Sequence, residues 1–396
     1  MKIVYNDVKN CKKTQKIDDF SLKIAEKVKI FHQTFDEYDL TPLVELKNLA
    51  RELNVKDIFV KDESKRFGLN AFKVLGGSYA IAKEIQKRFD LSDDEISFKK
   101  FASNRLSEKI KNLTFVTATD GNHGRGVAWS AQKLGANAIV YMPKGSAKER
   151  FDNIIKTGAK CVVTDCNYDD TVRVAKDEAA KHDYVFVQDT AFENYVDIPL
   201  HIMQGYMTLA LEAHKQLKAV PTHIFVQAGV GSLSGAMKAF FANVYGKNKP
   251  KLIVVEPNNA GCIFKTAKAN DGKLHFVKGE LKTIMAGLSC GEPCSIGYEI
   301  LHCYADAFIK IGDGVAKKAM KKLAFPVGDD QKIVSGESGC AGFAAALDII
   351  QNEDEIKTKL GIDKKSVLLF VNTEGDTDKE NYNKIVYGTN AANMQN

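Results

Sequence analysis

Hydrophobic and polar positions along this chain alternate between two kinds of segment. Short apolar runs predict strands at Leu113–Thr119, Ala138–Met142, Lys160–Asp165, Tyr184–Asp189, His223–Gly229, Lys251–Glu256, Ala307–Ile311 and Val367–Asn372. Longer segments between the runs predict helices at Ser78–Lys87, Asn122–Leu134, Ala147–Thr157, Tyr168–His182, Leu233–Val244, Gly314–Ala324 and Cys340–Gln351. Strands that alternate with helices pair in parallel through right-handed crossovers. The pattern therefore predicts an α/β protein with two open sheets and helices on both faces.

Composition narrows the class of protein. The chain has 396 residues, of which 44% are hydrophobic and 27% charged, so it can bury a core large enough for two domains. The net charge of +6 is modest, and no basic stripe interleaved with aromatic residues suggests nucleic acid. The segment Met1–Lys16 lacks the apolar stretch of a signal peptide, and the apolar runs are too short to cross a membrane. We expect a cytoplasmic protein without a membrane or nucleic-acid partner.

A lysine and three polar loops are the candidates for chemistry. Lys73 follows Phe72 and precedes a glycine pair, at the start of a predicted helix. Burial there disfavours the ammonium form, which suits a lysine that forms a Schiff base. Polar loops follow three predicted strands, at 117–124, 227–235 and 372–376. Ligands bind at such carboxyl ends in open α/β sheets.

The glycine-rich loop after His223–Gly229 is typical of a phosphate site. Glycines let backbone N–H groups turn toward an anion, and the helix that follows adds its positive end. The spacing G-x-G-x-x-x-G from Gly229 to Gly235 departs from the dinucleotide fingerprint. The phosphate-binding candidates are Gly229, Val230, Gly231, Ser232 and Leu233. Ser232 could add a hydroxyl donor.

Along the chain come Lys73, the loop with Asn122, the glycine-rich loop and the loop with Thr373. This order resembles that of the fold-type II pyridoxal phosphate (PLP) enzymes. This family includes the serine and threonine dehydratases and the tryptophan synthase β subunit, and the resemblance extends from about Thr41 to Asp378. It implies a tryptophan synthase β-like fold, PLP as cofactor, no metal and a homodimer. It also implies a small domain at 81–206, inserted into a large PLP-binding domain formed by 1–80 and 207–396.

The resemblance assigns a role to each matching residue. Lys73 would hold PLP as a Schiff base, and the glycine loop would bind its phosphate. Asn122 would donate to the 3′-oxygen of PLP, although it could equally cap the helix that it begins. The hydroxyl of Thr373 would face the pyridine nitrogen. A hydroxyl does not keep that nitrogen protonated as a carboxylate would, and the weaker electron sink suits elimination of a β-substituent.

Two aspartates distinguish among substrates. The dehydratases usually carry a small hydroxyl residue where this chain has Asp120. A carboxylate there can remove an α-proton or bind a second ammonium group of the substrate. The runs 120–129 and 286–293 resemble the diaminopropionate ammonia-lyases. That resemblance implies that Asp120 takes the α-proton of the D-enantiomer and Asp189 that of the L-enantiomer of 2,3-diaminopropionate, an amino acid cleaved to pyruvate and two molecules of ammonia.

Several alternatives remain open at this level. Asp189 could be a turn cap. The whole chain could be a serine or threonine dehydratase, or a non-catalytic PLP-binding regulatory protein. The loop 335–339 could cap a helix and make partial contact with the site. Glu374 is interpreted as an acidic loop residue. A monovalent cation site formed by the acidic residues of that loop is a further option. The segment 86–112 is polar and predicts a solvated surface insertion.

The cysteines give no metal or disulfide pattern. The eight are scattered without a C-x-x-C pair, and buried free thiols are the expectation. A pairing of Cys262 with Cys290 or Cys294 is the alternative, since these residues follow separate strands.

Overall fold

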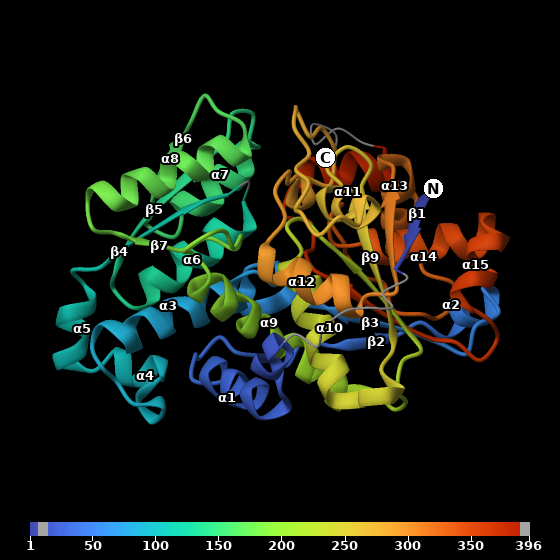
Figure 1. The fold of residues 1–396 in the computed structure, drawn as a ribbon, viewed down its shortest axis with the longest axis horizontal. Coiled ribbons are helices and arrows are strands. Elements are labelled where there is room, and N and C mark those ends of the chain that lie inside the picture. Colours follow the sequence, from blue (N-terminus) through green and yellow to red (C-terminus); the bar gives the residue numbers. More distant parts are fainter. Residues whose placement is uncertain (7–14, 120, 389–396) are drawn as a thin grey trace, which may run out of the picture.

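Two β-sheets, each packed against helices, build the molecule (Figure 1). The computed structural model describes residues 1–6, 15–119 and 121–388. In Figure 1 the four-stranded sheet lies in the left half and the seven-stranded sheet in the right half. The predicted fold class, an α/β protein with two open sheets, is confirmed.

The seven-stranded sheet has the order β1-β10-β9-β8-β11-β3-β2. Its strands are β1 (Lys2–Tyr5), β2 (Leu43–Glu45), β3 (Asp57–Asp62), β8 (His223–Gln227), β9 (Lys251–Pro257), β10 (Ala307–Ile311) and β11 (Val367–Asn372). The five inner strands are parallel, and β1 and β2 pair antiparallel at the two edges. Parallel pairing brings the carboxyl ends of β8 and β11 to one edge of the sheet.

Helices cover both faces of this sheet. Successive side chains of a strand point to opposite faces, so a strand whose side chains are all apolar needs cover on both. On β8, Ile224 and Val226 share one hydrophobic cluster with Phe240 of α10 (Ser232–Tyr245). The residue between them, Phe225, belongs to a second cluster with Phe343 of α14 (Ala341–Asn352). The other helices around this sheet are α1 (Leu22–His32), α2 (Lys47–Glu52), α9 (Asp197–Gln216), α11 (Cys262–Ala269), α12 (Ser295–Tyr304), α13 (Asp313–Ala324), α15 (Asp354–Leu360) and α16 (Lys379–Tyr387).

The four-stranded sheet is parallel throughout, in the order β6-β5-β4-β7. Its strands are β4 (Thr114–Ala118), β5 (Asn137–Met142), β6 (Lys160–Val163) and β7 (Val185–Phe186). Its part of the chain also contains α3 (Val74–Arg88), α4 (Phe98–Phe101), α5 (Asn104–Ile110), α6 (Asn122–Lys133), α7 (Lys148–Ile155) and α8 (Tyr168–Lys181). These strands fall inside the range 81–206 expected for an inserted domain, whose boundaries stay a prediction.

The structure differs from the sequence-based elements in several respects, and the helices α2, α4, α5, α11, α12, α15 and α16 are among the elements that were not predicted. The hydrophobic pattern did not predict β1, β2, β3, α1 or the 20-residue helix α9. Helix α3 begins at Val74, four residues before the expected start at Ser78, so Lys73 becomes its N-cap residue. Strand β7 ends at Phe186, and Asp189 lies in the loop beyond it. The segment 86–112 is not wholly solvated, because Phe101 and Ile110 are buried in the core.

A buried charge cluster, formed by Lys61, Glu63, Arg66 and Glu212, anchors α9. Lys61 Nζ and Arg66 Nη2 each lie 2.7 Å from Glu212 Oε2, and Arg66 Nε lies 2.7 Å from Glu63 Oε2. All four side chains are fully buried. Burial alone would raise the pKa of Glu212, but Arg66 and Lys61 hold it below its ordinary value. The cluster therefore ties α9 to β3 and to the turn that follows β3.

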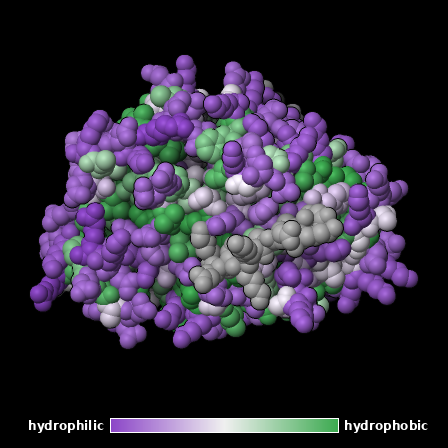
Figure 2. All heavy atoms as spheres, viewed as in Figure 1, coloured by the Kyte–Doolittle hydropathy of each residue, from purple (hydrophilic) through white to green (hydrophobic). Residues whose placement is uncertain are grey.

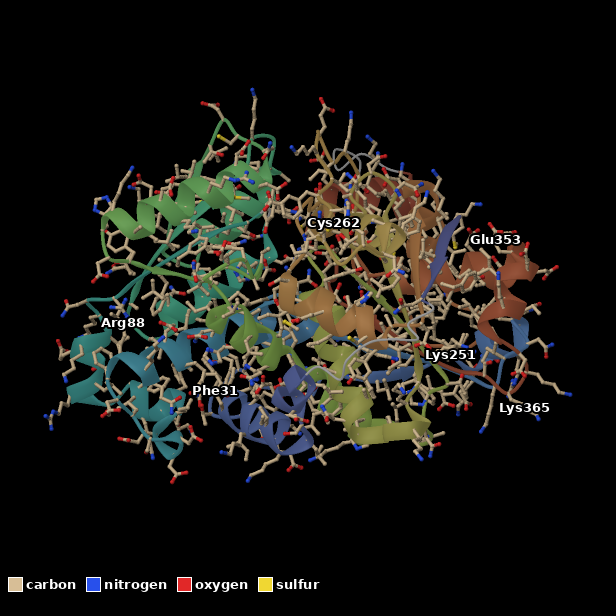
Figure 3. The ribbon with its side chains drawn as sticks, viewed as in Figure 1. Phe31, Arg88, Lys251, Cys262, Glu353 and Lys365 are labelled. Atoms are coloured by element: carbon tan, nitrogen blue, oxygen red, sulfur yellow. The ribbon has the colours of Figure 1, made fainter. Side chains whose placement is uncertain are left out.

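The surface is largely polar. Figure 2 shows hydrophilic side chains over most of the viewed face, with hydrophobic residues in smaller patches among them. Charged side chains such as Arg88, Lys251 and Lys365 are exposed at the periphery (Figure 3). Among the described residues, no helix is both long and apolar enough to cross a membrane.

Candidate active site

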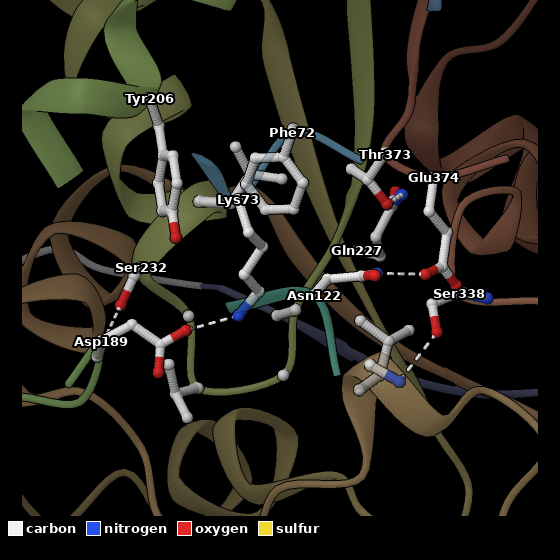
Figure 4. Close-up of a pocket in the computed structure, with 17 residues that line it drawn as sticks. Phe72, Lys73, Asn122, Asp189, Tyr206, Gln227, Ser232, Ser338, Thr373 and Glu374 are labelled. Carbon is white, nitrogen blue, oxygen red and sulfur yellow. Dashed lines mark hydrogen bonds and ion pairs between the residues drawn. The ribbon is translucent and has the colours of Figure 1, made fainter. Parts of the chain in front are cut away.

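A pocket at the carboxyl ends of β8 and β11 brings together most of the predicted site residues (Figure 4). The loops that follow β4 and β7 of the smaller sheet and the start of α3 complete its wall. Its lining residues are Phe72, Lys73, Asn122, Asp189, Tyr206, Gln227, Ala228, Gly229, Val230, Gly231, Ser232, Leu233, Gly287, Leu288, Ser338, Thr373 and Glu374. The two sheets thus contribute to one site.

Lys73 enters the pocket beside Phe72, whose ring packs on Tyr206 with a centroid separation of 4.7 Å. Its ammonium group forms an ion pair with Asp189 (Figure 4). Burial alone would lower the pKa of Lys73, but the Asp189 carboxylate outweighs burial and raises this pKa above its ordinary value. The expectation that burial would favour the neutral amine is therefore wrong for this arrangement, because a buried carboxylate lies against the amine.

Asp189 is only 2% exposed. Burial alone would raise the pKa of its carboxyl group, but Lys73 counters that effect and the pKa lies below its ordinary value. Oδ2 contacts Lys73, while Oδ1 is buried without a hydrogen-bond partner among the described residues. Asp189 is therefore a charged carboxylate with one oxygen free for a ligand in the pocket.

The glycine loop forms a close-fitting turn at the start of α10. Gly231 adopts a φ of +96°, which favours glycine, and a Cβ added there would lie 2.9 Å from Ile263 Cδ1. A Cβ at Gly229 would lie 3.2 Å from both Cys290 Sγ and Gly287 O. Within the described structure, the N–H groups from Gly229 to Leu233 make no backbone hydrogen bond. They remain available to an anion.

The Ser232 hydroxyl, which was expected as a donor to a phosphate, is hydrogen-bonded within the protein instead. It donates to the carbonyl oxygen of Asp189 at 2.6 Å and so connects the glycine loop to the Asp189 loop. The hydroxyl hydrogen is therefore committed within the protein, and the backbone N–H of Ser232 is the donor that remains.

Asn122 is the first residue of α6, and its side-chain amide donates to Glu374 Oε2 (Figure 4). Glu374 is 1% exposed and also accepts from Ser338 N at 3.3 Å and from Thr377 Oγ1 at 3.3 Å. It is a pocket residue rather than only a loop acid. The second amide hydrogen of Asn122 is left for a ligand oxygen.

Thr373 follows β11 directly and is 4% exposed. Its Oγ1 accepts a hydrogen bond from Gln227 Nε2 at 2.9 Å. The sequence analysis did not assign Gln227, Glu374 or Tyr206 to the site. Gln227 and Glu374 each lie within a strand-end loop that the sequence had already indicated, at 227–235 and 372–376, and this is the signal that could have found them. Tyr206 was missed because α9 was not predicted.

Asp120 lies outside the described residues, so its role stays a prediction. Its neighbour Gly121 is close to Arg150, since a Cβ added at Gly121 would lie 3.0 Å from Arg150 Cδ.

A larger cavity of about 720 Å³ adjoins the site. It is lined by residues of both sheet regions, among them Arg150, Ala286, Glu337 and Asn381. Burial and then the nearby Glu374 raise the pKa of Glu337 to about 7. Ser338 and Gly287 of the site pocket are sequence neighbours of Glu337 and Ala286, which line this cavity.

Cys262, Cys290 and Cys294 are buried free thiols, as expected, and are not paired with one another. Cys262 lies on the first turn of α11 (Figure 3). Cys303 is disulfide-bonded, which corrects the expectation for that residue. Among the described residues, no group of three or more His, Cys, Asp or Glu could hold a metal ion.

Comparison with known proteins identifies the family. Residues 35–373 match the family described as pyridoxal-phosphate dependent enzymes. The chain belongs to this family. It is 48% identical to the diaminopropionate ammonia-lyase of Escherichia coli, over 93% of this chain and 92% of that protein. The corresponding enzyme of Salmonella typhimurium is 44% identical, over 93% of each chain. The resemblance to the diaminopropionate ammonia-lyases is therefore confirmed.

Solved structures agree with this assignment. The fold matches the E. coli enzyme in complex with an aminoacrylate-PLP azomethine reaction intermediate, with a TM-score of 0.89, 44% identity and coverage of 98% of this chain and 97% of that one. Threonine deaminase isoform 2 of Solanum lycopersicum matches at a TM-score of 0.73 and 18% identity, covering 98% and 96% of the two chains, a likeness of fold alone.

PLP is the cofactor of this family, and the residues of the pocket fit it. The loop 229–233 offers uncommitted N–H donors in a turn where a Cβ at Gly229 or Gly231 would be crowded by neighbouring atoms. Lys73 would supply the amine, and Tyr206 Oη and Asp189 Oδ1 are buried pocket atoms without a protein partner among the described residues. Phosphate, aldehyde and polar ring substituents of PLP would each find a matching group.

Proposed function

We propose that this chain catalyses the PLP-dependent α,β-elimination of 2,3-diaminopropionate, in both the D and the L form. The α-proton and the β-amino group leave the substrate, and water then replaces the remaining nitrogen. The products are pyruvate and two molecules of ammonia. The identity of 48% to the E. coli diaminopropionate ammonia-lyase over 93% of the chain supports this substrate.

The observation that carries the proposal is the Lys73–Asp189 ion pair beside the glycine loop. Bound PLP supplies an electron sink for the α-carbon. Lys73 binds the cofactor, the N–H groups of 229–233 hold its phosphate, and Asn122 and Thr373 orient its ring. Asp189, with one carboxylate oxygen uncommitted, accepts the α-proton of the L-substrate, and Asp120 accepts that of the D-substrate.

A buried carboxylate also selects the substrate. Diaminopropionate carries a second ammonium group, which can pair with an aspartate in the site, whereas serine and threonine carry a hydroxyl. A carboxylate without a cationic partner in a dry pocket costs free energy. Asp189 already pairs with Lys73, so a second aspartate at position 120 favours the diamino acid, whose β-ammonium group can pair with it.

The direct test measures pyruvate and ammonia released by the purified holoenzyme from D- and L-diaminopropionate, L-serine and L-threonine. We expect turnover of both diaminopropionate enantiomers to exceed that of the hydroxy amino acids. Faster release from serine or threonine would make the chain a dehydratase. A change in the visible absorbance of the cofactor without ammonia release would make it a PLP-binding regulatory protein.

The cofactor lysine has its own test. Borohydride reduction of the holoenzyme followed by peptide mapping should place the label on Lys73, and Lys73→Ala should abolish turnover. Lys61 is a suitable reference position because it is a buried lysine outside the pocket. Label on Lys61 or on any other lysine would overturn the assignment.

A cytoplasmic homodimer is part of the same proposal. It is supported by the family resemblance, since fold-type II enzymes are commonly dimers. Light scattering coupled to size-exclusion chromatography should give twice the chain mass of 43.7 kDa. A monomer mass for the active holoenzyme would contradict it.

A further inference from the structure

The side-chain amide of Gln227 has an orientation that its partners determine. Gln227 is the last residue of β8 and is 2% exposed. Its Nε2 donates to Gly339 O at 2.8 Å and to Val371 O at 3.0 Å. Backbone carbonyls only accept, so a flipped amide would set its oxygen against two other oxygens. The nitrogen must therefore face this side.

This orientation constrains the hydroxyl of Thr373. The same Nε2 lies 2.9 Å from Thr373 Oγ1. An amide nitrogen cannot accept a hydrogen bond, so Oγ1 can only be the acceptor in this contact. The two hydrogens of Nε2 serve three acceptors, so one hydrogen is shared between two of these oxygens. Among the described residues, Thr373 Oγ1 makes no other hydrogen bond, and both side chains line the site pocket. The hydroxyl hydrogen is thus directed away from Gln227 and has no protein acceptor.

The other end of the amide makes a purely structural role a poor explanation. Gln227 Oε1 is buried and has no hydrogen-bond partner in the described structure. A buried amide kept for packing and hydrogen bonding would be expected to satisfy both ends, because an unpaired buried acceptor is costly. Gln227 thus keeps an unpaired Oε1 while its Nε2 contacts the hydroxyl oxygen of Thr373.

We propose that Gln227 is a positioning residue that makes the Thr373 hydroxyl a hydrogen-bond donor to the pyridine nitrogen of PLP. The inference rests on the proposed placement of the PLP ring against Thr373. A nitrogen that receives this bond must present its lone pair, so it stays unprotonated. A protonated nitrogen would set its own hydrogen against the hydroxyl hydrogen of Thr373, for which the described residues offer no other acceptor. Gln227 thereby keeps the ring a weaker electron sink, which suits elimination.

The test uses holoenzyme reconstituted with PLP that carries ¹⁵N in the ring, and it records the nitrogen chemical shift against pH without substrate. The wild-type shift should be that of an unprotonated nitrogen across the stable pH range. Gln227→Met removes the donor at similar volume and leaves the Gly339 and Val371 carbonyls free for the Thr373 hydroxyl. The ring nitrogen should then protonate at least about tenfold more readily, a change of about one unit in its pKa.

Gln204→Met is the matched control. Gln204 is a mostly buried glutamine on α9 that donates to Asp19 O and lies outside the pocket. It should leave the nitrogen shift unchanged. Gln227→Leu provides a second donor-free variant if the methionine variant does not fold.

Two results would overturn the inference. One is a protonated nitrogen in the wild-type holoenzyme at neutral pH. The other is a Gln227 variant whose nitrogen shift follows that of the Gln204 control at every pH. Because no substrate is present, either result is distinguishable from a failure to turn over diaminopropionate.

Discussion

At the scale of single residues, Lys73 illustrates how charge can outweigh burial. The sequence placed it in a partly dry site, which by itself favours a neutral amine. The structure adds Asp189, whose carboxylate favours the ammonium form. The same contact leaves Asp189 charged in the pocket, so the pair prepares an amine for the cofactor and a base for the substrate.

The two aspartates should separate the enantiomers. Enantiomers held by the same anchors present their α-protons to opposite faces, and a base must come within about 3 Å of the proton that it removes. We expect Asp189→Asn to lower kcat/KM for L-diaminopropionate by about a hundredfold or more, and Asp120→Asn to do so for the D form. Each variant is measured on both substrates. Equal losses on both in each variant would show that the division of labour is wrong.

Glu337 should make stability depend on pH. Its folded pKa of about 7 lies above the ordinary value of 4.5. Between these values the folded state binds more protons than the unfolded state, so the free energy of unfolding falls as pH rises from about 4.5 to about 7. Over about 2.5 pH units the loss is at most about 3 kcal/mol. Glu337→Gln should remove this part of the decline in urea titrations at a series of pH values.

Glu355→Gln serves as the control for that series because Glu355 is exposed. The control should retain the wild-type decline. If the free energy of unfolding of Glu337→Gln changes with pH in parallel with that of the wild type, Glu337 has the same pKa in the folded and unfolded states.

At the scale of elements, the turn between β8 and α10 decides how the phosphate is held. Its backbone at Gly231 needs a positive φ, and both Gly229 and Gly231 meet neighbouring atoms where a side chain would begin. The loop therefore depends on glycine for its shape as well as for access to its N–H groups.

Gly231→Asp should weaken PLP binding more than Gly231→Ala. Both variants carry the strain of a side chain at positive φ, about 1–3 kcal/mol, and only aspartate adds a negative charge beside the phosphate. We expect the aspartate variant to bind PLP at least about tenfold more weakly than the alanine variant, a difference of about 1.4 kcal/mol. Titration of the apoenzymes with PLP measures this. Equal affinities would place the phosphate elsewhere.

The buried charge cluster should dominate the anchoring of α9. Glu212→Gln removes a carboxylate that pairs with both Lys61 and Arg66, so we expect a loss of about 3–5 kcal/mol in the free energy of unfolding. Glu26→Gln is the control, because Glu26 makes an exposed ion pair with Lys215 of the same helix. It should cost about 0–1 kcal/mol. Similar small losses in both variants would mean that the cluster adds little to stability.

At the scale of the whole molecule, the site joins the two sheet regions. Asn122 and Asp189 come from the region of the smaller sheet, while the glycine loop and Thr373 come from the larger one. Lys73 lies at the start of α3, next to Phe72, whose backbone N–H donates to Thr373 O. A ligand that touches all of them stabilises only the arrangement in which both regions are folded and in place.

PLP should therefore raise the melting temperature in a concentration-dependent way. A ligand at a hundred times its dissociation constant adds about 2.7 kcal/mol to the free energy of unfolding. Calorimetry over a PLP series should show the rise, and pyridoxal without the phosphate should give a smaller one at equal concentration. A melting temperature independent of PLP would contradict a site shared by the two regions.

The sequence by itself determined the parts of the fold that local pattern controls. Strands such as Ala307–Ile311 and Val367–Asn372 were predicted with the bounds that the structure has, because buried parallel strands are nearly continuous apolar runs. The strand-end loops also indicated that Asn122, the glycine loop and Thr373 lie near one another, because parallel strands bring their carboxyl ends to one edge. The family resemblance added Lys73 to this group. Helix α9, which is buried along most of its length, was not predicted.

Only the tertiary structure decided which side chains face each other across the pocket. The contact of Asp189 with Lys73, that of Glu374 with Asn122 and that of Gln227 with Thr373 each join residues more than 100 positions apart. Hydrogen bonds and ion pairs depend on distances of about 3 Å. Hydrophobic periodicity determines which face of a strand or helix is buried, but it carries no information at that precision, so the charge on Lys73 and the direction of the Thr373 hydroxyl follow from the packing of the two sheets.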